Sequence, residues 1–276
     1  MESKNNFDAN SKFTEKSIPL IEAKNICKKF SSSQFLFGKN KSMTALENVS
    51  LKIFQGTTYA LVGESGSGKS TLANILLNLL PSESGEVFFH EKNLLQFSRQ
   101  EKKDFRKLAQ IIFQNPYESL NPTMRVKDII EEPLIIHKIG EDKFARKKIV
   151  NEMRTLTGLD SSLMERHAWE LSGGQRQRVA ICAAMILRPE FLVCDECVSA
   201  LDVLVQAQIL NLLKDFQKSL GITYLFISHN LDVVSYMADT IGVMKDGHIV
   251  EEGAAENILQ NPKHEYTKKL LAASRI

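Results

Sequence analysis

The sequence has no long run of apolar residues. The longest unbroken run, residues 179–187, contains nine, whereas a helix that crosses a bilayer needs about 20. Residues 1–17 are polar and have no apolar core, so we predict a disordered tail there and no secretory signal peptide. Together these observations predict a cytoplasmic protein that has no membrane span of its own.

The sequence also lacks an excess of charge and is poor in cysteine. Its 35 basic and 33 acidic residues give a net charge of +2, which argues against nucleic acid as a partner held by bulk charge. Four cysteines in 276 residues are too few for a disulfide framework. Cys194 and Cys197 have the spacing of a zinc or redox pair, but no second Cys/His pair lies at zinc-site spacing. We therefore expect neither a structural metal nor a disulfide.

Segments of strand and helix character alternate along the rest of the chain. Strands are expected within residues 18–30, 45–56, 57–63, 85–95, 108–116, 191–196, 223–229 and 239–253. Helices are expected over residues 70–80, where Pro81 stops the helix, over much of 117–178 and at about 204–218. This alternation predicts an α/β fold with a mainly parallel central sheet and an inserted helical subdomain at about 117–178.

One glycine-rich segment matches a phosphate-binding loop. Residues 63–70 fit the pattern G-x-x-x-x-G-K-[ST] and lie between an expected strand and an expected helix, which disfavours an accidental glycine-rich turn. The glycines free backbone N–H groups to hold phosphates, Lys69 can reach the β- and γ-phosphates, and the Ser70 hydroxyl can ligate Mg²⁺. The nucleotide-binding residues predicted here are Gly63, Glu64, Ser65, Gly66, Ser67, Gly68, Lys69, Ser70 and Thr71.

Polar side chains end three further apolar strands. Asp195 is expected beside the phosphate loop, where it can hold Mg²⁺, and Glu196 is then placed to act as general base toward an attacking water. His229 can donate a hydrogen bond to a γ-phosphate at the carboxyl edge of the sheet, although a lone histidine is more often structural. Gln114 can ligate Mg²⁺ or hold the water; taken alone, a surface amide before a proline turn is the better interpretation.

A second segment, residues 171–178 (LSGGQRQR), also has the character of an anion site. It is a loop that opens onto a helix. The adjacent Gly173 and Gly174 are expected to let the backbone turn tightly and to aim N–H groups at a ligand, with the helix dipole behind them. One chain thus carries two phosphate-binding loops of different design.

The ordered motifs GESGSGKS, FQNP, LSGGQRQR, FLVCDE, SALD and SH resemble those of the ATP-binding subunit of an ABC transporter, over about residues 18–270. The resemblance implies a P-loop NTPase core of the RecA-like type, with an antiparallel β subdomain and the helical subdomain. It also implies that two subunits pack head to tail, so that each ATP lies between the phosphate loop of one chain and LSGGQ of the other. The residues that would serve the partner's site are Ser172, Gly173, Gly174 and Gln175, with Asp202 coupling the two sites.

An aromatic ring is expected to stack on adenine, because the base offers a flat π-face. In similar proteins this residue ends the first strand, which corresponds to Phe30 here. Phe35 and Phe37 are alternatives, and packing in the core is the other interpretation of all three.

Longer stretches resemble the dipeptide, oligopeptide and nickel branch of ABC importers, notably FQNPYESLNPTMRV, VSALDVLVQAQIL and NPKHEYTKKLL. The sequence departs from that pattern at Cys197, Ala183 and Leu204, and it ends without the cysteine-bearing extension of some oligopeptide subunits. The resemblance implies hydrolysis of ATP, with Mg²⁺, at the cytoplasmic face of the membrane to drive import of peptides or nickel complexes.

The partners that the resemblance implies are a second ATP-binding subunit, identical or related, two membrane permeases and, indirectly, an extracellular binding protein. Two alternatives stay open at this point. One is an ABC-type ATPase of DNA repair or translation, and the other is a phosphotransferase with a phosphate loop.

Overall fold

The structure, a computed structural model, describes residues 18–32, 41–115 and 119–273. The predicted tail, Phe35 and Phe37 lie outside the described residues. The strands are β1 (Pro19–Ser32), β2 (Lys41–Phe54), β3 (Thr58–Val62), β4 (Ser84–Phe89), β5 (Lys92–Asn93), β6 (Ala109–Ile112), β7 (Phe191–Asp195), β8 (Thr223–Ile227), β9 (Thr240–Lys245) and β10 (His248–Ala254). The helices are α1 (Lys69–Leu76), α2 (Arg99–Leu108), α4 (Val126–Ile136), α5 (Lys143–Leu156), α6 (Gly173–Met185), α7 (Val203–Leu220), α8 (Leu231–Met237), α9 (Ala255–Gln260) and α10 (Glu265–Ala273).

The central sheet has the strand order β10-β9-β3-β8-β7-β6. Its strands pair in parallel except for β9 and β10, which are antiparallel. All residues of β3 and β8 are buried, as expected where both faces of a parallel sheet are covered. The predicted α/β fold with a mainly parallel central sheet is therefore confirmed.

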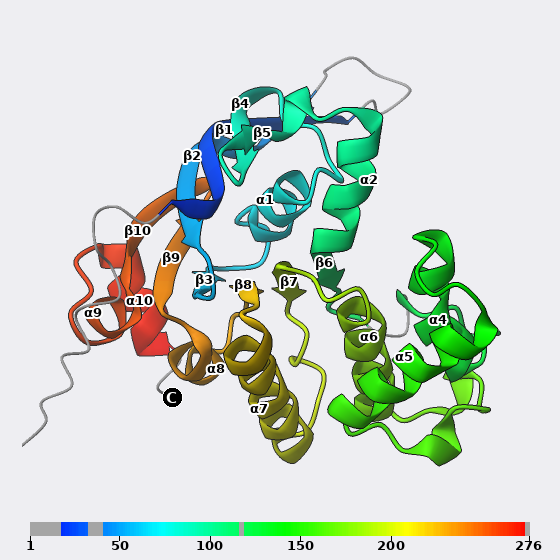
Figure 1. The fold of residues 1–276 in the computed structure, drawn as a ribbon. Helices are drawn as coiled ribbons and strands as arrows, with labels where there is room; N and C mark the ends of the chain where they lie inside the picture. Colours follow the sequence, from blue (N-terminus) through cyan, green and yellow to red (C-terminus); the bar gives the residue numbers. More distant parts are fainter. Residues whose placement is uncertain (1–17, 33–40, 116–118, 274–276) are drawn as a thin grey trace, which may run out of the picture.

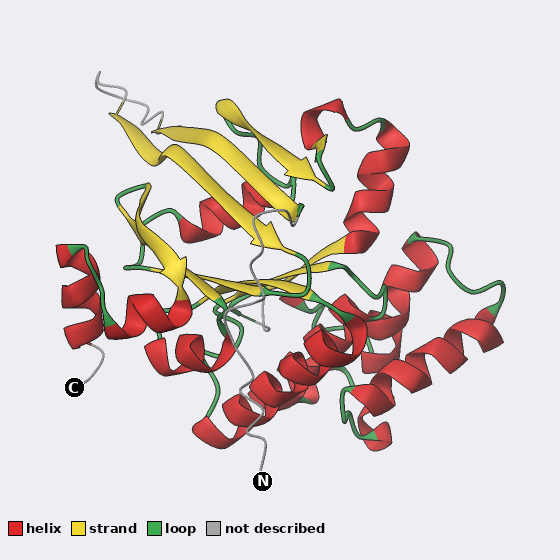
Figure 2. Cartoon of the chain, turned by 60° about the vertical axis from the view of Figure 1, so that its left-hand side comes forward, coloured by secondary structure: helices red, strands yellow, loops and turns green. Residues whose placement is uncertain are grey.

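A second, antiparallel sheet with the order β2-β1-β4-β5 lies above α1. Figure 2 shows the two sheets as separate layers. One hydrophobic cluster joins Leu51 of β2, Leu72 of α1 and Val193 of β7. Helix α1 therefore packs between the sheets, and this packing holds the phosphate loop that precedes it.

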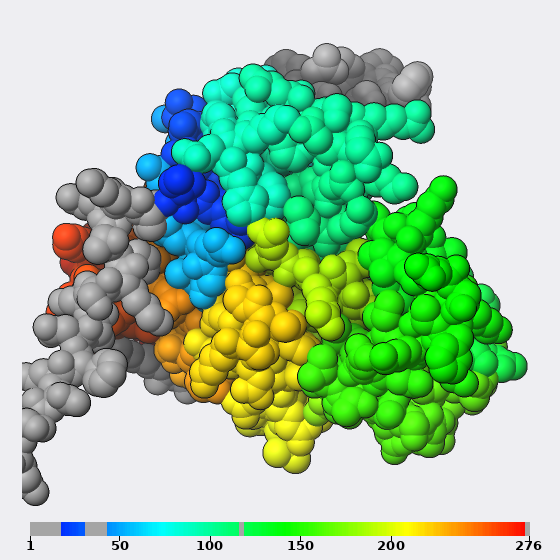
Figure 3. Space-filling view, viewed as in Figure 1, coloured from blue at the N-terminus to red at the C-terminus, as the bar shows by residue number. Residues whose placement is uncertain are grey.

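The other face of the central sheet is covered by helices. Phe191 and Val193 of β7 belong to the cluster around α1, whereas Leu192 and Cys194 belong to a second cluster with α4, α6 and α7. This division follows from the alternation of side chains along a strand. In Figure 3 the residues of α4 and α5 (green) form a lobe beside the rest of the molecule, with a hollow between this lobe and α2.

The predicted helix at 70–80 is too long. Helix α1 ends at Leu76, and Asn78 adopts a left-handed conformation with φ of 54°. A helix cannot continue through such a residue, so α1 stops before Pro81. No helix in the described part of the chain is long and apolar enough to cross a membrane.

Candidate nucleotide site

Four parallel strands bring their carboxyl ends to the same edge of the central sheet. Ile227 in β8 pairs with Leu61 in β3 on one side and with Asp195 in β7 on the other. Ile112 in β6 pairs with Cys194 in β7. Segments that follow these strands therefore meet above one edge, where α/β proteins bind ligands. The predicted residues that this topology brings together are Gly63, Gln114, Glu196 and His229.

The phosphate loop adopts a conformation that glycine alone fits at two positions. Gly63 has φ of 152° and Gly68 has φ of 105°. A Cβ on Gly63 would lie 2.1 Å from the carbonyl oxygen of Met244, and one on Gly68 would lie 2.4 Å from that of Ala45. By contrast, a Cβ on Gly66 would meet nothing within 4 Å. The loop is thus held tightly at its base and is open where a phosphate could approach.

Lys69 lies inside this loop. Its Nζ donates to the carbonyl oxygens of Gly63 at 2.8 Å and Glu64 at 2.7 Å. Burial lowers the pKa of Lys69, while the carboxylates of Glu196 and Asp195 act in the opposite direction. Its ammonium therefore lies where it can attract an anion, and it can exchange carbonyl oxygens for phosphate oxygens.

The two acids at the end of β7 have different surroundings. The Asp195 carboxyl is largely buried, and burial raises its pKa, opposed by a hydrogen bond from Ser70. Carboxylate and hydroxyl oxygens of this kind are suitable ligands for Mg²⁺, so this pair fits the predicted metal role.

Glu196 is instead surrounded by donors. Gln114 Nε2 donates to Glu196 Oε2 at 2.8 Å, and His229 Nδ1 lies 3.2 Å from the same oxygen. The backbone of Glu196 has φ of 48°, and its N–H donates to the carbonyl oxygen of Ile227. The side chain of Glu196 is only 17% exposed, so its carboxylate has a fixed position beside the phosphate loop.

These groups border one pocket of about 610 Å³. Phe30, half-exposed near the end of β1, is one of the residues that line it, and Lys28 Nζ lies 5.5 Å from its ring centre. Its role in stacking on adenine stays a prediction. The pocket is lined by Phe30, Met43, Ala45, Gly63, Glu64, Ser65, Gly66, Gly68, Lys69, Ser70, Thr71, Gln114, Glu196, His229 and Leu270. Asp195 lies behind this surface, next to Ser70.

Three lining residues are absent from the prediction. Met43 reaches the pocket because it pairs with Phe30 in the β1–β2 register. No local sequence motif predicts that register. Ala45 follows on the same strand. Leu270 comes from α10, and its only signal in the sequence is the NPKHEYTKKLL segment, which resembles the importer branch but predicts no role in the site.

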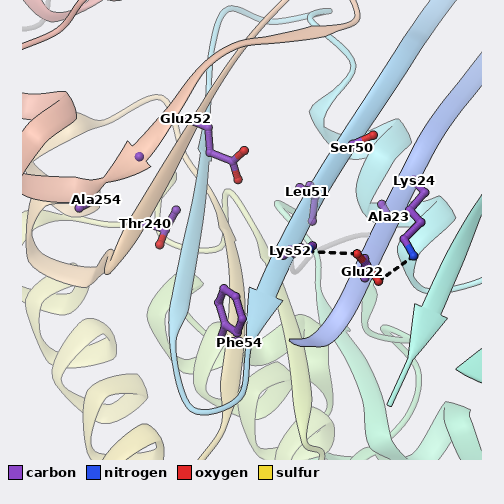
Figure 4. Close-up of a pocket in the computed structure, with 11 residues that line it drawn as sticks. Glu22, Ala23, Lys24, Ser50, Leu51, Lys52, Phe54, Thr240, Glu252 and Ala254 are labelled. Atoms are coloured by element: carbon purple, nitrogen blue, oxygen red, sulfur yellow. Dashed lines mark ion pairs between the residues drawn. The ribbon is translucent and has the colours of Figure 1, made fainter. Parts of the chain in front are cut away.

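A slightly larger hollow of about 640 Å³ lies between β1, β2 and β10 (Figure 4). None of the predicted site residues lines it. Its wall carries Glu22, whose carboxylate is bound by Lys24 at 3.2 Å and Lys52 at 3.4 Å. Both lysines of this hollow are paired with Glu22, and no residue of the phosphate loop lines it, so the smaller pocket is the better nucleotide site.

The LSGGQ segment does not line the nucleotide pocket. Ser172 is the N-cap of α6: its Oγ accepts from the N–H of Gln175, whose side chain accepts from the N–H of Ser172. The prediction of a tight glycine turn is wrong, because α6 begins at Gly173 and neither glycine has a positive φ. A Cβ on Gly174 would lie 2.7 Å from Val205 Cγ1 of α7, so this glycine permits close helix packing.

Asp202 lies outside the pocket as well. It is the N-cap of α7, where its carboxylate accepts from the N–H of Val205 at 3.0 Å. The start of α7 therefore packs on the start of α6, through Val205 and Gly174. The LSGGQ and SALD segments form one surface of the monomer that is separate from the nucleotide pocket.

Comparisons with known proteins agree with the geometry of the pocket. The model of the ABC transporter family matches residues 46–199. The chain is 43% identical to the oligopeptide transport ATP-binding protein OppF of Streptococcus mutans, over 94% of this chain and 83% of the relative. It is 44% identical to the dipeptide transport ATP-binding protein DppF of Haemophilus influenzae, over 93% of this chain and 78% of the relative.

A solved structure shows the same fold. It is a dimeric ATP-binding cassette in a post-hydrolysis state with ADP and phosphate, which matches with a TM-score of 0.75 and 29% identity over 85% of this chain and 98% of its own. The chain therefore belongs to the ABC transporter family, as one of its ATP-binding, ATP-hydrolysing subunits.

Proposed function

We propose that this subunit hydrolyses ATP to drive the import of peptides. The observation that carries the ATPase role is the meeting of the phosphate loop with Glu196, Gln114 and His229 in one pocket. The observation that favours peptides is that the relatives are named for oligopeptide and dipeptide transport. These names give no specific support to nickel as cargo, and the comparisons do not support a non-transport ATPase.

The phosphate loop would bind the phosphates of ATP. The space next to Gly66 is open, and Lys69 would leave the carbonyls of Gly63 and Glu64 to meet the β- and γ-phosphates. When bound, Mg²⁺ would neutralise charge that develops on the phosphates, and Ser70, Asp195 and Gln114 are the residues that would hold it.

Glu196 would act as the general base. Its carboxylate would accept a proton from a water that attacks the γ-phosphate, with ADP as the leaving group. Gln114 and His229 both contact Glu196 Oε2, so they can hold the carboxylate in place. His229 would also donate to an oxygen of the γ-phosphate.

The second half of each site would come from a partner subunit. The surface formed by Ser172, Gly173, Gly174, Gln175 and Asp202 is separate from the nucleotide pocket of its own chain. In a head-to-tail dimer it would cover the γ-phosphate bound by the partner. The similar cassette solved as a dimer supports this arrangement.

Two permeases and an extracellular binding protein would complete the importer, with this subunit at the cytoplasmic face of the membrane. The hollow between α2 and the α4–α5 lobe (Figure 3) is the surface that we propose for contact with a permease. Phe113, the residue that follows β6, is 46% exposed, and such an exposed aromatic side chain fits an interface.

The cargo can be tested by uptake. Cells that lack this chain should lose most uptake of a radiolabelled dipeptide or pentapeptide and keep uptake of radiolabelled nickel, and the intact chain should restore the loss. A chain with Glu196→Gln should fail to restore it, because uptake would require hydrolysis. Loss of nickel uptake with normal peptide uptake would refute the cargo assignment.

A further inference from the structure

Helix α10 contacts the phosphate loop at the point where the loop leaves β3. The backbone N–H of Glu64 donates to the hydroxyl oxygen of Tyr266 at 3.2 Å. Tyr266 is only 8% exposed. Leu270, one turn further along α10, lines the nucleotide pocket. The C-terminal helix thus forms part of one wall of the site, although it lies outside the residues that match the family model, 46–199.

The start of α10 is itself fixed to the central sheet. Glu251 of β10 accepts from the backbone N–H groups of Lys263 at 2.7 Å and His264 at 3.0 Å. Lys245, at the end of β9, places its Nζ 5.1 Å from the centre of the Tyr266 ring, a cation–π contact. Tyr266 is therefore held from two strands, and it can in turn hold the loop.

The Tyr266 hydroxyl remains neutral near physiological pH. Burial raises its pKa, the hydrogen bond from the Glu64 backbone lowers it, and the charge of the Glu64 carboxylate raises it, with a net rise. A neutral phenol can accept one hydrogen bond and donate another. The contact with the Glu64 N–H therefore does not depend on a change of charge near pH 7.

The contact with Tyr266 is also independent of Lys69. Lys69 binds the carbonyl oxygens of Gly63 and Glu64 and has to leave them to reach a phosphate. The N–H of Glu64 points to Tyr266 instead. This hydrogen bond can persist while the Lys69 side chain turns, so the loop keeps one fixed point during the exchange.

We propose that Tyr266 is a positioning residue for ATP: its hydroxyl holds the first peptide of the phosphate loop in the orientation that receives the phosphates. The inference rests on the proposed ATP-binding role of the loop. Without the hydroxyl, Glu64 would sample other orientations, and a smaller share of the molecules would have the binding-competent loop. Apparent affinity falls in proportion to that share.

The test is Tyr266→Phe in the full chain. Phenylalanine keeps the ring, its packing and its contact with Lys245, and it removes only the hydroxyl. A single hydrogen bond of this kind corresponds to about a two- to tenfold change in an equilibrium constant. We expect the Kd for a fluorescent ATP analogue and the KM for ATP to rise together by about that factor, with kcat changed less than about twofold.

Tyr236→Phe is the matched control. The Tyr236 hydroxyl also makes a hydrogen bond, to Asn211 at 2.5 Å, but Tyr236 does not line the nucleotide pocket. Its removal should leave Kd and KM unchanged. A positioning role requires that Kd and KM rise in Tyr266→Phe and stay unchanged in Tyr236→Phe. A general loss of stability would instead lower the fraction of active protein, and hence kcat, without a change in KM.

Unchanged Kd and KM in Tyr266→Phe would overturn the inference, and so would a fall in kcat at constant KM. An equal rise in Kd for both variants would overturn it as well. Failure of the unaltered chain to bind the ATP analogue would refute the proposed function of the loop, and that result is distinguishable because it needs no variant.

Discussion

Two helices of this protein begin at glycine-rich motifs, and they satisfy their first N–H groups in different ways. Helix α1 follows Gly68, which has φ of 105° and makes no side-chain cap. Helix α6 follows Ser172, whose Oγ accepts from the N–H of Gln175 in a complete capping box. The first turn of α1 therefore lacks a side-chain acceptor, whereas the first turn of α6 already has one from its own chain.

Only the first of these two motifs contains a lysine, and the roles that we propose for the two loops account for this. A helix start without a cap is suited to bind an anion, and Lys69 supplies a positive charge inside that loop. The capped start of α6 is stable without a ligand. This fits our proposal that LSGGQ covers a phosphate already bound by the phosphate loop of the partner subunit.

Lys69→Ala is expected to have the largest effect on the phosphate loop. We expect this variant to lose ATP hydrolysis and to bind a fluorescent ATP analogue at least about tenfold more weakly, because the charge that meets the β- and γ-phosphates is removed. Titration of the analogue and steady-state ATPase assays measure the two effects.

Lys24→Ala is the control for this variant. Lys24 is half-exposed and pairs with Glu22 in the hollow between β1, β2 and β10. A surface ion pair of this kind contributes little to the stability of the protein. Equal losses in Lys24→Ala and Lys69→Ala would show that the effect is not specific to the loop.

Glu196→Gln should separate binding from chemistry. The amide still offers an oxygen to Gln114 but cannot accept a proton from water, so we expect kcat to fall at least about 100-fold with little change in nucleotide affinity. ATP should then remain bound between the two loops, and gel filtration with ATP should show a stable dimer. Turnover at the rate of the unaltered chain would exclude Glu196 as the general base.

Much of the nucleotide site could be predicted because its information is local. The phosphate loop is a continuous motif, Asp195 ends an apolar strand, and Gln114 and His229 follow two others. Parallel pairing then brings these strand ends together. Met43 could not be predicted in this way, because it reaches the site through the register of β1 with β2.

The prediction missed helices α2, α8, α9 and α10. Helix α2 contains only two apolar residues, Phe105 and Leu108, and only Phe105 is buried, so its apolar pattern is too sparse to identify a helix. Its capping box, Ser98 with Glu101, was a readable signal of a helix start. The role of Gly174 depends on Val205 of another helix, and no local pattern contains that contact.

Ser172→Arg tests whether the capped loop acts on the partner's nucleotide. The variant should bind the ATP analogue as the unaltered chain does but hydrolyse no ATP, because the arginine would obstruct the dimer interface. If the protein forms homodimers, mixing the Ser172→Arg and Lys69→Ala chains produces mixed dimers. In these dimers the Ser172→Arg chain supplies an intact phosphate loop, and the Lys69→Ala chain supplies an intact LSGGQ segment to the same site. We expect activity to return on mixing, measured as phosphate release. If the partner is a related subunit, each change goes into one chain of the pair.

The decisive control is the affinity of the isolated Ser172→Arg chain. Loss of nucleotide binding in the monomer would mean that LSGGQ acts on the ATP of its own chain. The arrangement with two chains would then be wrong.

The smallest expected effect concerns the two glycines of α6, which differ in what surrounds them. A Cβ on Gly174 would lie 2.7 Å from Val205 Cγ1, whereas a Cβ on Gly173 would have its nearest neighbour, Leu201 Cδ2, at 4.0 Å. We expect Gly174→Ala to lower the free energy of unfolding by about 1–3 kcal/mol, the usual cost of overpacking. Gly173→Ala should be neutral or slightly stabilising, because alanine favours the helix. Urea unfolding without nucleotide measures both, and Val205→Ala should remove most of the penalty in Gly174→Ala. Equal stability of the two single variants would show that Gly174 is not required for packing, and its place in the motif would then have to be explained by the partner's nucleotide alone.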